Sequence, residues 1–164
     1  MSHSIGPALR QRWQQLSALP GGRWLFSRLL GQMAPYTGSI GARVEVLKPG
    51  YCRVQLKDRR AVRNHLRSIH AIALCNLGEM ATGLALMNSL PDNTRGILVN
   101  ICADYHHKAR GTLQAECHCE IPADNREQQY EVVASVRDES GETVTTVTAS
   151  WLLGPDTSHN PDAN

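Results

Sequence analysis

One acidic residue, Glu79, stands in the middle of a long apolar stretch of the chain. Between residues 71 and 87 the other polar side chains are those of Asn76 and Thr82. A carboxylate in such surroundings loses hydration, which raises its pKa and destabilises the fold unless the group is paired or performs chemistry. Carboxylates of this kind are enriched at active sites, where they serve as nucleophiles or general bases. The alternative is that Glu79 faces a solvent-filled groove or a partner side chain and performs no chemistry.

His70 stands where a polar segment meets this apolar stretch, at the predicted start of a helix. The backbone N–H groups of Ala71 and Ile72 lack helical partners there, and the helix dipole adds positive potential. Such donors suit the negative charge that develops on an oxygen during acyl transfer. A histidine in this place is more often a cap or a surface residue. Glu79 lies about 13 Å further along a helix axis, so a site that used both ends would need helices from two subunits.

The elements that must hold these residues follow from the spacing of apolar side chains. Residues 69–90 are apolar on nearly every face, which predicts a helix that is buried on most sides. Asn76 and Glu79 in its middle argue against a membrane span. The other expected elements are helix over 7–34 with a break at 20–22, a turn at 35–39, a hairpin over 42–56, and strands at about 96–107, 111–121, 127–138 and 143–153.

This order predicts an α+β fold in which one antiparallel β-sheet wraps around a long buried central helix, with an N-terminal helical extension. We expect a single domain over 1–153, of which 1–35 form a helical arm, and a disordered tail over 154–164. Such a sheet leaves one edge and part of the helix uncovered. We therefore expect the chain to form a homo-oligomer in which a second subunit covers these surfaces.

Composition narrows the class of protein. Apolar residues make up 41% and charged residues 20% of the chain, as in an ordinary globular domain. A net charge of +2 is too small to indicate nucleic acid or a membrane as the main partner. The five cysteines have no disulfide-framework spacing, and the first residues lack the apolar core of a secretory signal. Both features predict a cytoplasmic protein.

The segment Cys117-His118-Cys119 is the one fragment that suggests a metal site. Alternation along a strand would place the two thiols on one face and the imidazole on the other. A second pair of ligands at zinc spacing is missing from the sequence, so we predict no metal site.

Four residues, spaced as Asn64-x5-His70-x6-Leu77-x-Glu79, resemble the signature of the phenylacetate-pathway type of hotdog acyl-CoA thioesterase. The superfamily also includes the 4-hydroxybenzoyl-CoA thioesterases. Residues 48–52 look like the family's early strand pair, and residues 100–111 look like its strand, basic turn and glycine. The resemblance covers roughly residues 36–153. It implies the hotdog fold and hydrolysis of an acyl-CoA to free acid and coenzyme A, with coenzyme A as part of the substrate and no separate cofactor.

The resemblance also implies a role for each matching residue. Glu79 would act as nucleophile or as general base on water, and the N–H of Ala71 would polarise the thioester carbonyl. Asn64 and His70 would hold the loop and contact the thioester or the attacking water. Glu79 would come from one protomer and the donors from the other, in a homodimer or in a homotetramer built as a dimer of dimers.

Lys108 and Arg110 lie beside Gly111 in the predicted turn between two adjacent strands, and they are the candidates for binding the phosphates of coenzyme A. An equally simple explanation is that both residues are charged side chains of a solvent-exposed turn and bind no ligand. Arg67 and Arg126 are weaker candidates.

Two departures from the family pattern keep other functions open. Ala71-Ile72 stands where the family has Gly-Gly, and the apolar residues 96–99 stand where it has Ser or Thr, which leaves Asn100 as the nearest polar candidate. A non-catalytic acyl-binding module, which would bind acyl-CoA without turnover, fits both departures. A hotdog dehydratase or hydratase is a third alternative, but the aromatic-Pro sequence that follows its histidine is missing.

Overall fold

The computed structural model describes residues 4–156 of the 164-residue chain. Its elements are α1 (Gly6–Ser17), α2 (Gly22–Met33), α3 (Pro35–Ser39), β1 (Arg43–Lys48), β2 (Tyr51–Leu56), the 3-10 turn η1 (Arg60–Val62), α4 (Ala71–Met87), β3 (Thr94–Tyr105), β4 (Leu113–His118), β5 (Gln128–Arg137) and β6 (Thr143–Pro155).

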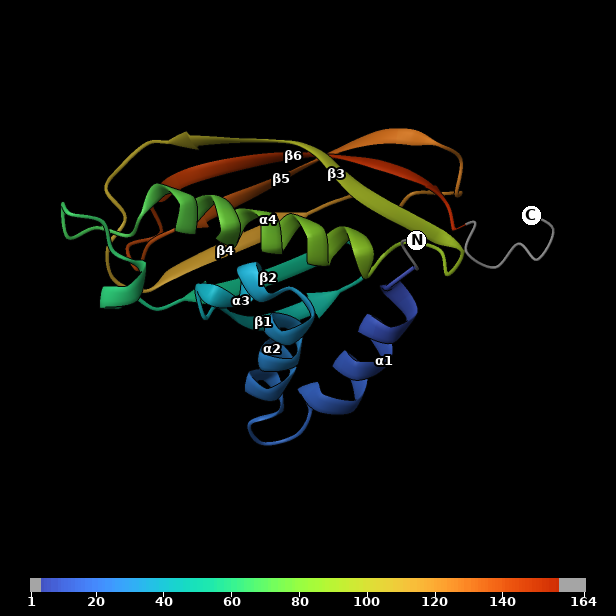
Figure 1. Ribbon diagram of the computed structural model, residues 1–164, viewed down its shortest axis with the longest axis horizontal. Helices are drawn as coiled ribbons and strands as arrows, with labels where there is room; N and C mark the ends of the chain where they lie inside the picture. The colour runs from blue at the N-terminus through green and yellow to red at the C-terminus, as the bar shows by residue number, and fades with distance from the viewer. Residues whose placement is uncertain (1–3, 157–164) are drawn as a thin grey trace.

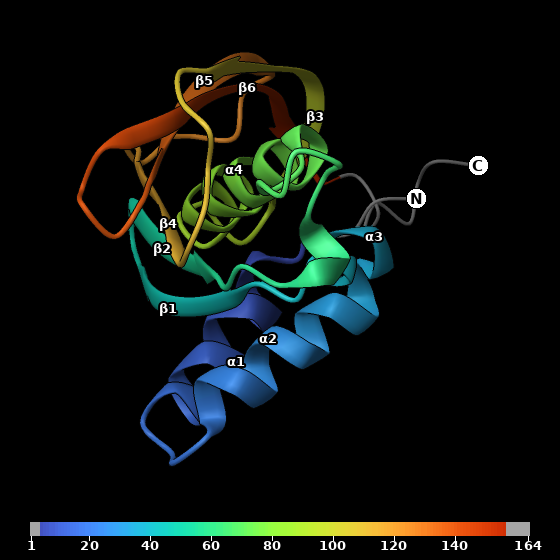
Figure 2. The same cartoon turned by 90° about the vertical axis from the view of Figure 1, so that its left-hand side faces the viewer.

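The six strands form one antiparallel sheet in the order β1-β2-β4-β5-β6-β3. Figures 1 and 2 show this sheet curving around α4, which lies in its concave face. Strands β1 and β3 are the two edges. The predicted α+β architecture is therefore confirmed.

Helix α4 is buried along most of its length, as its composition predicts. Thr82 is fully buried and its hydroxyl donates to the carbonyl oxygen of Glu79 at 2.9 Å, which satisfies the hydroxyl within the helix. Gly78 marks the closest approach to the sheet, because a Cβ at this position would lie 2.3 Å from Val147 Cγ2 on β6. The absence of a side chain at Gly78 thus sets how deeply the helix sits in the sheet.

The N-terminal arm consists of helices α1 and α2, which pack against each other and against the rest of the domain. The rings of Trp13 and Phe26 meet edge to face, with centroids 5.0 Å apart, and Phe26 is 2% exposed. The Ser27 hydroxyl accepts a hydrogen bond from the backbone N–H of Val44 at 2.9 Å. Helix α2 thereby covers part of the free edge of β1, and Figure 1 shows the arm beneath that strand.

Several predicted boundaries shift. Residues 35–39, predicted as a turn, form the short helix α3, because Pro35 suits the first helical position and Gly38 packs closely on Gly31 of α2. The central helix ends earlier than 90, and β6 continues to Pro155, beyond the expected limit at 153. The rest of the predicted tail, residues 157–164, lies outside the described residues.

Within residues 4–156, no helix combines the length and apolar character needed to cross a membrane.

Candidate active site

Glu79 lies on α4 with its side chain half-buried against apolar groups. A Cβ on Gly83 would stand 3.7 Å from Glu79 Oε1 and 3.2 Å from two ring atoms of Trp151, so the carboxylate lies over that glycine beside the indole. Loss of hydration through burial raises the pKa of Glu79. Among residues 4–156 no side chain hydrogen-bonds or pairs with this carboxylate. It is therefore a desolvated acid with its oxygens available to a ligand.

His70 caps α4 with its side chain. Its backbone is extended, and its Nδ1 accepts from the N–H of Ile72 at 3.1 Å. The expectation that Ile72 offers a free N–H is therefore wrong, because the imidazole already occupies that donor. The N–H of Ala71 has no acceptor among the described residues and is the donor that remains at the helix start.

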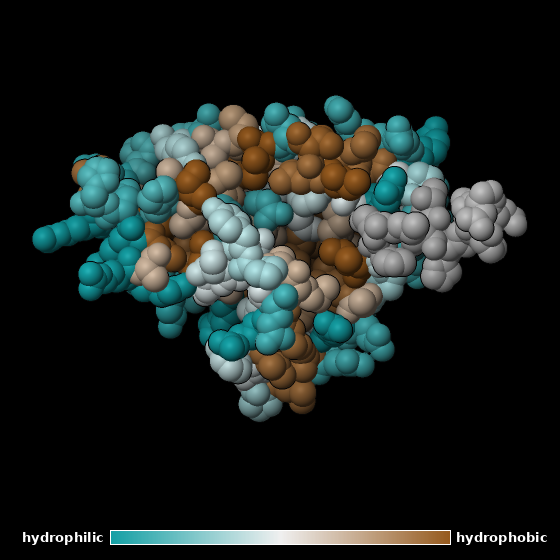
Figure 3. All heavy atoms as spheres, viewed as in Figure 1, coloured by the Kyte–Doolittle hydropathy of each residue, from teal (hydrophilic) through white to brown (hydrophobic). Residues whose placement is uncertain are grey.

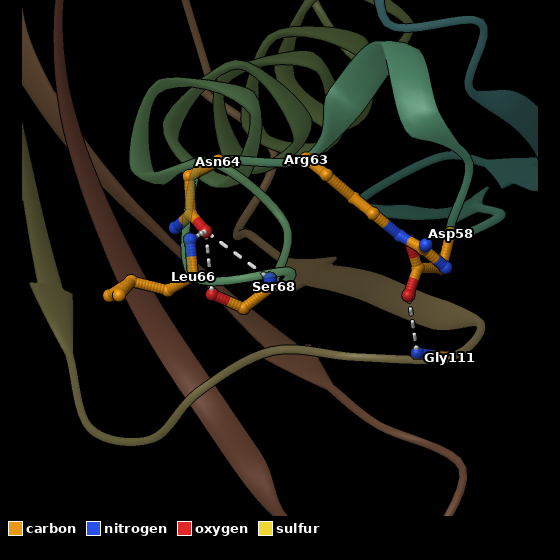
Figure 4. A network of polar contacts seen from close by, with 6 residues as sticks. All are labelled: Asp58, Arg63, Asn64, Leu66, Ser68 and Gly111. Carbon is orange, nitrogen blue, oxygen red and sulfur yellow. Dashed lines mark hydrogen bonds and ion pairs between the residues drawn. The ribbon is translucent and has the colours of Figure 1, made fainter.

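Asn64 organises the loop that leads to His70 (Figure 4). Its Oδ1 accepts from the N–H of Leu66 at 2.9 Å, and from the N–H and hydroxyl of Ser68, both at 3.2 Å. Its own N–H donates to the Ser68 carbonyl at 2.8 Å. Arg67, inside this tight loop, has a positive φ of 56°. The side-chain amide nitrogen of Asn64 has no partner within the described residues.

A second contact fixes the loop to the turn between β3 and β4. Asp58 pairs with Arg63 at 2.6 Å through Oδ1 and accepts from the N–H of Gly111 at 3.2 Å through Oδ2 (Figure 4). The hydrogen bond from Arg63 is the main reason why the pKa of Asp58 is lowered. The N–H of Ile69 also donates to the carbonyl of Ala109 at 2.9 Å. The turn and the start of α4 are thus held together.

Lys108 and Arg110 project from this turn. Both side chains are exposed, and neither forms an ion pair within the part of the chain that the structure describes. They lie on either side of Ala109, whose carbonyl contacts Ile69. The two cations therefore stand near the helix start. Arg126, by contrast, pairs with Asp124 at 2.8 Å in a separate loop.

The structure thus brings five of the six predicted residues together and leaves one apart. Asn64, His70, Ala71, Lys108 and Arg110 gather at the N-terminal end of α4, whereas Glu79 lies about 12 Å further along the helix axis. A single chain cannot place the carboxylate and the Ala71 N–H on the same carbonyl group.

Partly exposed residues of α4 and β3 lie between Glu79 and the N-terminal end of α4. Cys75 lies one turn before Glu79 on α4, and its charge interactions are with Glu79 and with Cys102 on β3. Burial raises the pKa of Cys75. The Tyr105 hydroxyl donates to the carbonyl of Ala71 at 3.0 Å. Sequence reasoning missed these neighbours, since only the register of β3 against β6 places them beside α4.

Sequence reasoning also missed a cavity of about 220 Å³ beside Glu79. Its walls come from α4, from the N-terminal arm, and from Gly96 and Trp151 of the sheet. Figure 3 shows hydrophobic residues along β3 and around a hollow between that strand and the arm. Five separated segments build the cavity, so no local motif could reveal it.

Other predicted features are placed as follows. Asn100 lies on the exposed edge strand β3. Cys117 is buried, whereas His118 is exposed with its ring 4.5 Å from that of Tyr51. Within residues 4–156 no group of three or more potential ligands is arranged to hold a metal ion.

Comparison with known proteins identifies a family and a fold. The model of a family described as a domain of unknown function, DUF4442, matches residues 22–153. No curated protein matches the chain.

Solved structures share the architecture. A crystal structure from a genomics programme is 29% identical and has a TM-score of 0.78, covering 90% of this chain and 99% of that one. A Pseudomonas aeruginosa protein designated a probable thioesterase is 23% identical, with a TM-score of 0.72 over 84% and 97% of the two chains. A phenylacetic acid degradation-related protein from Ralstonia eutropha is 18% identical, with a TM-score of 0.62 over 72% and 89%. The predicted hotdog fold is confirmed by these likenesses.

Proposed function

We propose that this chain, which belongs to the DUF4442 family, is a thioesterase that hydrolyses acyl-CoA to a free acid and coenzyme A in the cytoplasm. The observation that carries the proposal is the Glu79 carboxylate, which is desolvated, unpaired among the described residues and open to a cavity. The designation of the Pseudomonas aeruginosa structure as a probable thioesterase supports the same activity. The five cysteines, all free in the structure, support a reducing compartment.

The reaction adds water across the thioester bond. Glu79 either takes a proton from water, which attacks the carbonyl carbon, or attacks that carbon itself and is released by water. The Ala71 N–H stabilises the carbonyl oxygen as it gains negative charge. The carbon–sulfur bond then breaks, and the departing coenzyme A thiolate takes up a proton. Lys108 and Arg110 bind phosphates of the coenzyme A.

Two subunits are needed to complete this site, because Glu79 and the Ala71 N–H are too far apart within one chain. Strand β3 offers the surface for pairing. It is an edge strand of 12 residues, and its exposed side chains include Ile97, Val99 and Tyr105. Long exposed edges with apolar side chains favour pairing with another strand. A homodimer, or a dimer of dimers, would set the start of each α4 near the Glu79 of its partner.

A site shared between two subunits is tested with two variants, one that lacks the carboxylate of Glu79 and one that lacks the N–H of Ala71. Glu79→Gln should lower kcat by at least ~10²-fold. Ala71→Pro removes the N–H at the first helical position, where proline fits the helix. This variant should lower kcat by ~10²- to 10³-fold. Ala71→Gly keeps the N–H and is the matched control.

Equal mixing of the Glu79→Gln and Ala71→Pro proteins, after dissociation and reassembly, should restore roughly a quarter of the wild-type activity, because half of the dimers then carry one intact site. Recovery of no activity in mixtures that form heterodimers would show that each site lies within one chain. Hydrolysis at the wild-type rate by Glu79→Gln would show that Glu79 is not catalytic.

An acyl-CoA-binding module without turnover is the second candidate. Ile72, whose side chain is 52% exposed at the helix start, narrows the approach to the Ala71 N–H. Residues 95–105 of β3 also contain no serine or threonine that could hold a water molecule. Binding of several acyl-CoAs with no hydrolysis would favour this function.

A further inference from the structure

The cavity beside Glu79 has a mostly apolar lining. Helix α4 contributes Met80, Gly83, Leu84 and Met87, and the arm contributes further aliphatic side chains from α1 and α2. Apart from Glu79, the side chains of the lining that carry a charge or a hydroxyl are Arg12 and Thr37. A polar group placed deep in such a cavity would lose hydration with few partners. The occupant must therefore be apolar along most of its length.

The shape of the cavity favours a chain over a compact group. Its lining on α4 extends from Glu79 to Met87, about two turns or roughly 12 Å along the helix axis. Methionine side chains are flexible and adapt to irregular aliphatic surfaces. Met33, Met80 and Met87 all line the cavity. An unbranched hydrocarbon chain that starts at Glu79 would run parallel to α4.

The volume gives an approximate length for this chain. An apolar protein cavity of about 150 Å³ holds one benzene molecule. At the same packing, the 220 Å³ found here corresponds to roughly eight to ten carbon atoms.

The arm supplies the outer wall of the cavity. Arg10 donates to the carbonyl oxygens of Asn88 and Leu90, both at 3.1 Å, and pairs with Asp92. These contacts attach α1 to the segment that follows α4. Gly6 packs directly against the end of α4, since a Cβ there would lie 2.8 Å from the Met87 carbonyl oxygen. The arm is therefore attached near the end of α4, where it forms one wall of the cavity.

We propose that the cavity receives the acyl chain of the substrate, that the preferred substrates are unbranched medium-chain acyl-CoAs of about eight to ten carbons, and that α1 of the arm sets the upper limit of length. This inference rests on the proposed thioesterase function, in that Glu79 at one end of the cavity would meet the thioester carbonyl.

The test compares kcat/KM along a series of saturated acyl-CoAs from acetyl to palmitoyl, with phenylacetyl-CoA as a compact aromatic contrast. Each methylene that enters the cavity should raise kcat/KM by roughly three- to four-fold, up to an optimum near octanoyl or decanoyl. Ala8→Phe, on the wall of α1, should move the optimum to shorter chains and lower kcat/KM for decanoyl-CoA relative to butyryl-CoA by at least ~10-fold. Gln14→Phe adds the same ring to an exposed position of α1 outside the cavity lining and should leave the profile unchanged.

Binding is measured separately from turnover, by calorimetric titration of octanoyl-CoA and acetyl-CoA into the Glu79→Gln protein with and without Ala8→Phe. Tighter binding of octanoyl-CoA that Ala8→Phe abolishes would support the cavity even if the wild type hydrolyses no acyl-CoA, in which case only the thioesterase proposal fails. A flat profile from butyryl to decanoyl in an active enzyme, a preference for phenylacetyl-CoA over octanoyl-CoA, or equal effects of Ala8→Phe and Gln14→Phe would overturn the inference while the thioesterase stands.

Discussion

Replacement of Asn64 by alanine removes the acceptor that holds the loop before α4. Three hydrogen bonds to Oδ1 are lost, one from the N–H of Leu66 and two from Ser68. Each such bond contributes about 0.5–1.5 kcal/mol net, and the exposed contact to Leu66 contributes least, so the expected loss in the free energy of unfolding is about 2 kcal/mol. For a chain of this size that corresponds to a fall in Tm of roughly 4–8 °C.

Asn64→Asp separates the two roles proposed for this side chain. Aspartate keeps the acceptor oxygen for Leu66 and Ser68 but lacks the amide N–H donors, which have no partner among the described residues. We expect this variant to melt close to the wild type. If the amide contacts the thioester or the attacking water, turnover should still fall by ~10²-fold, the usual effect of a lost donor at the reacting carbonyl.

Differential scanning calorimetry and steady-state hydrolysis of the preferred acyl-CoA, on the same preparations, decide between these outcomes. An unchanged Tm for Asn64→Ala would refute the loop-holding role. Wild-type turnover by Asn64→Asp would refute the contact with substrate, and Asn64 would then be a positioning residue alone.

Three further changes give independent tests. Because burial raises the pKa of Glu79 above its ordinary value of 4.5, the rate of hydrolysis should rise with pH through that raised pKa. The stability that the protonated acid contributes is lost over the same pH window, so the Tm of Glu79→Gln should rise relative to that of the wild type as pH increases. A Tm difference between the two proteins that does not change with pH would contradict the desolvation of Glu79. Gly78→Ala places a methyl 2.3 Å from Val147. The overpacking should cost ~1–3 kcal/mol, more than the gain of about 1 kcal/mol in helix propensity, so the variant should be less stable than the wild type. A denaturant midpoint above that of the wild type would disprove this expectation. His70→Ala should cost about 1 kcal/mol because the Ile72 N–H loses its cap, whereas His70→Asn should retain it; equal urea midpoints for the two variants would exclude capping.

The fold was largely predictable because its main signals are local. An apolar helix with few polar breaks, followed by strands of period two, leaves few architectures in which the helix can be covered. The pattern of residues 35–39 predicts a turn because proline and glycine are typical of turns, whereas here Pro35 begins a helix and Gly38 allows contact with α2.

The candidate site was predictable only in part. The position of Glu79 on a buried helix followed from its neighbours, but the imidazole of His70 takes up one of the two donors expected at the helix start, and that choice depends on a side-chain rotamer. The cavity was beyond prediction, because it requires the arm to dock across the end of α4 through Arg10, and no periodic pattern encodes such a docking.

Asp58 joins two segments that would hold opposite ends of one substrate molecule. Through Arg63 and Gly111 it links the approach to α4 with the turn that carries Lys108 and Arg110. In the proposed complex, one connected segment would therefore contact both the nucleotide of coenzyme A and the thioester bond. A thioester on a shorter thiol carrier, such as pantetheine, would leave the turn empty and the loop without that support, so the missing phosphates should slow the bond-breaking step as well as weaken binding.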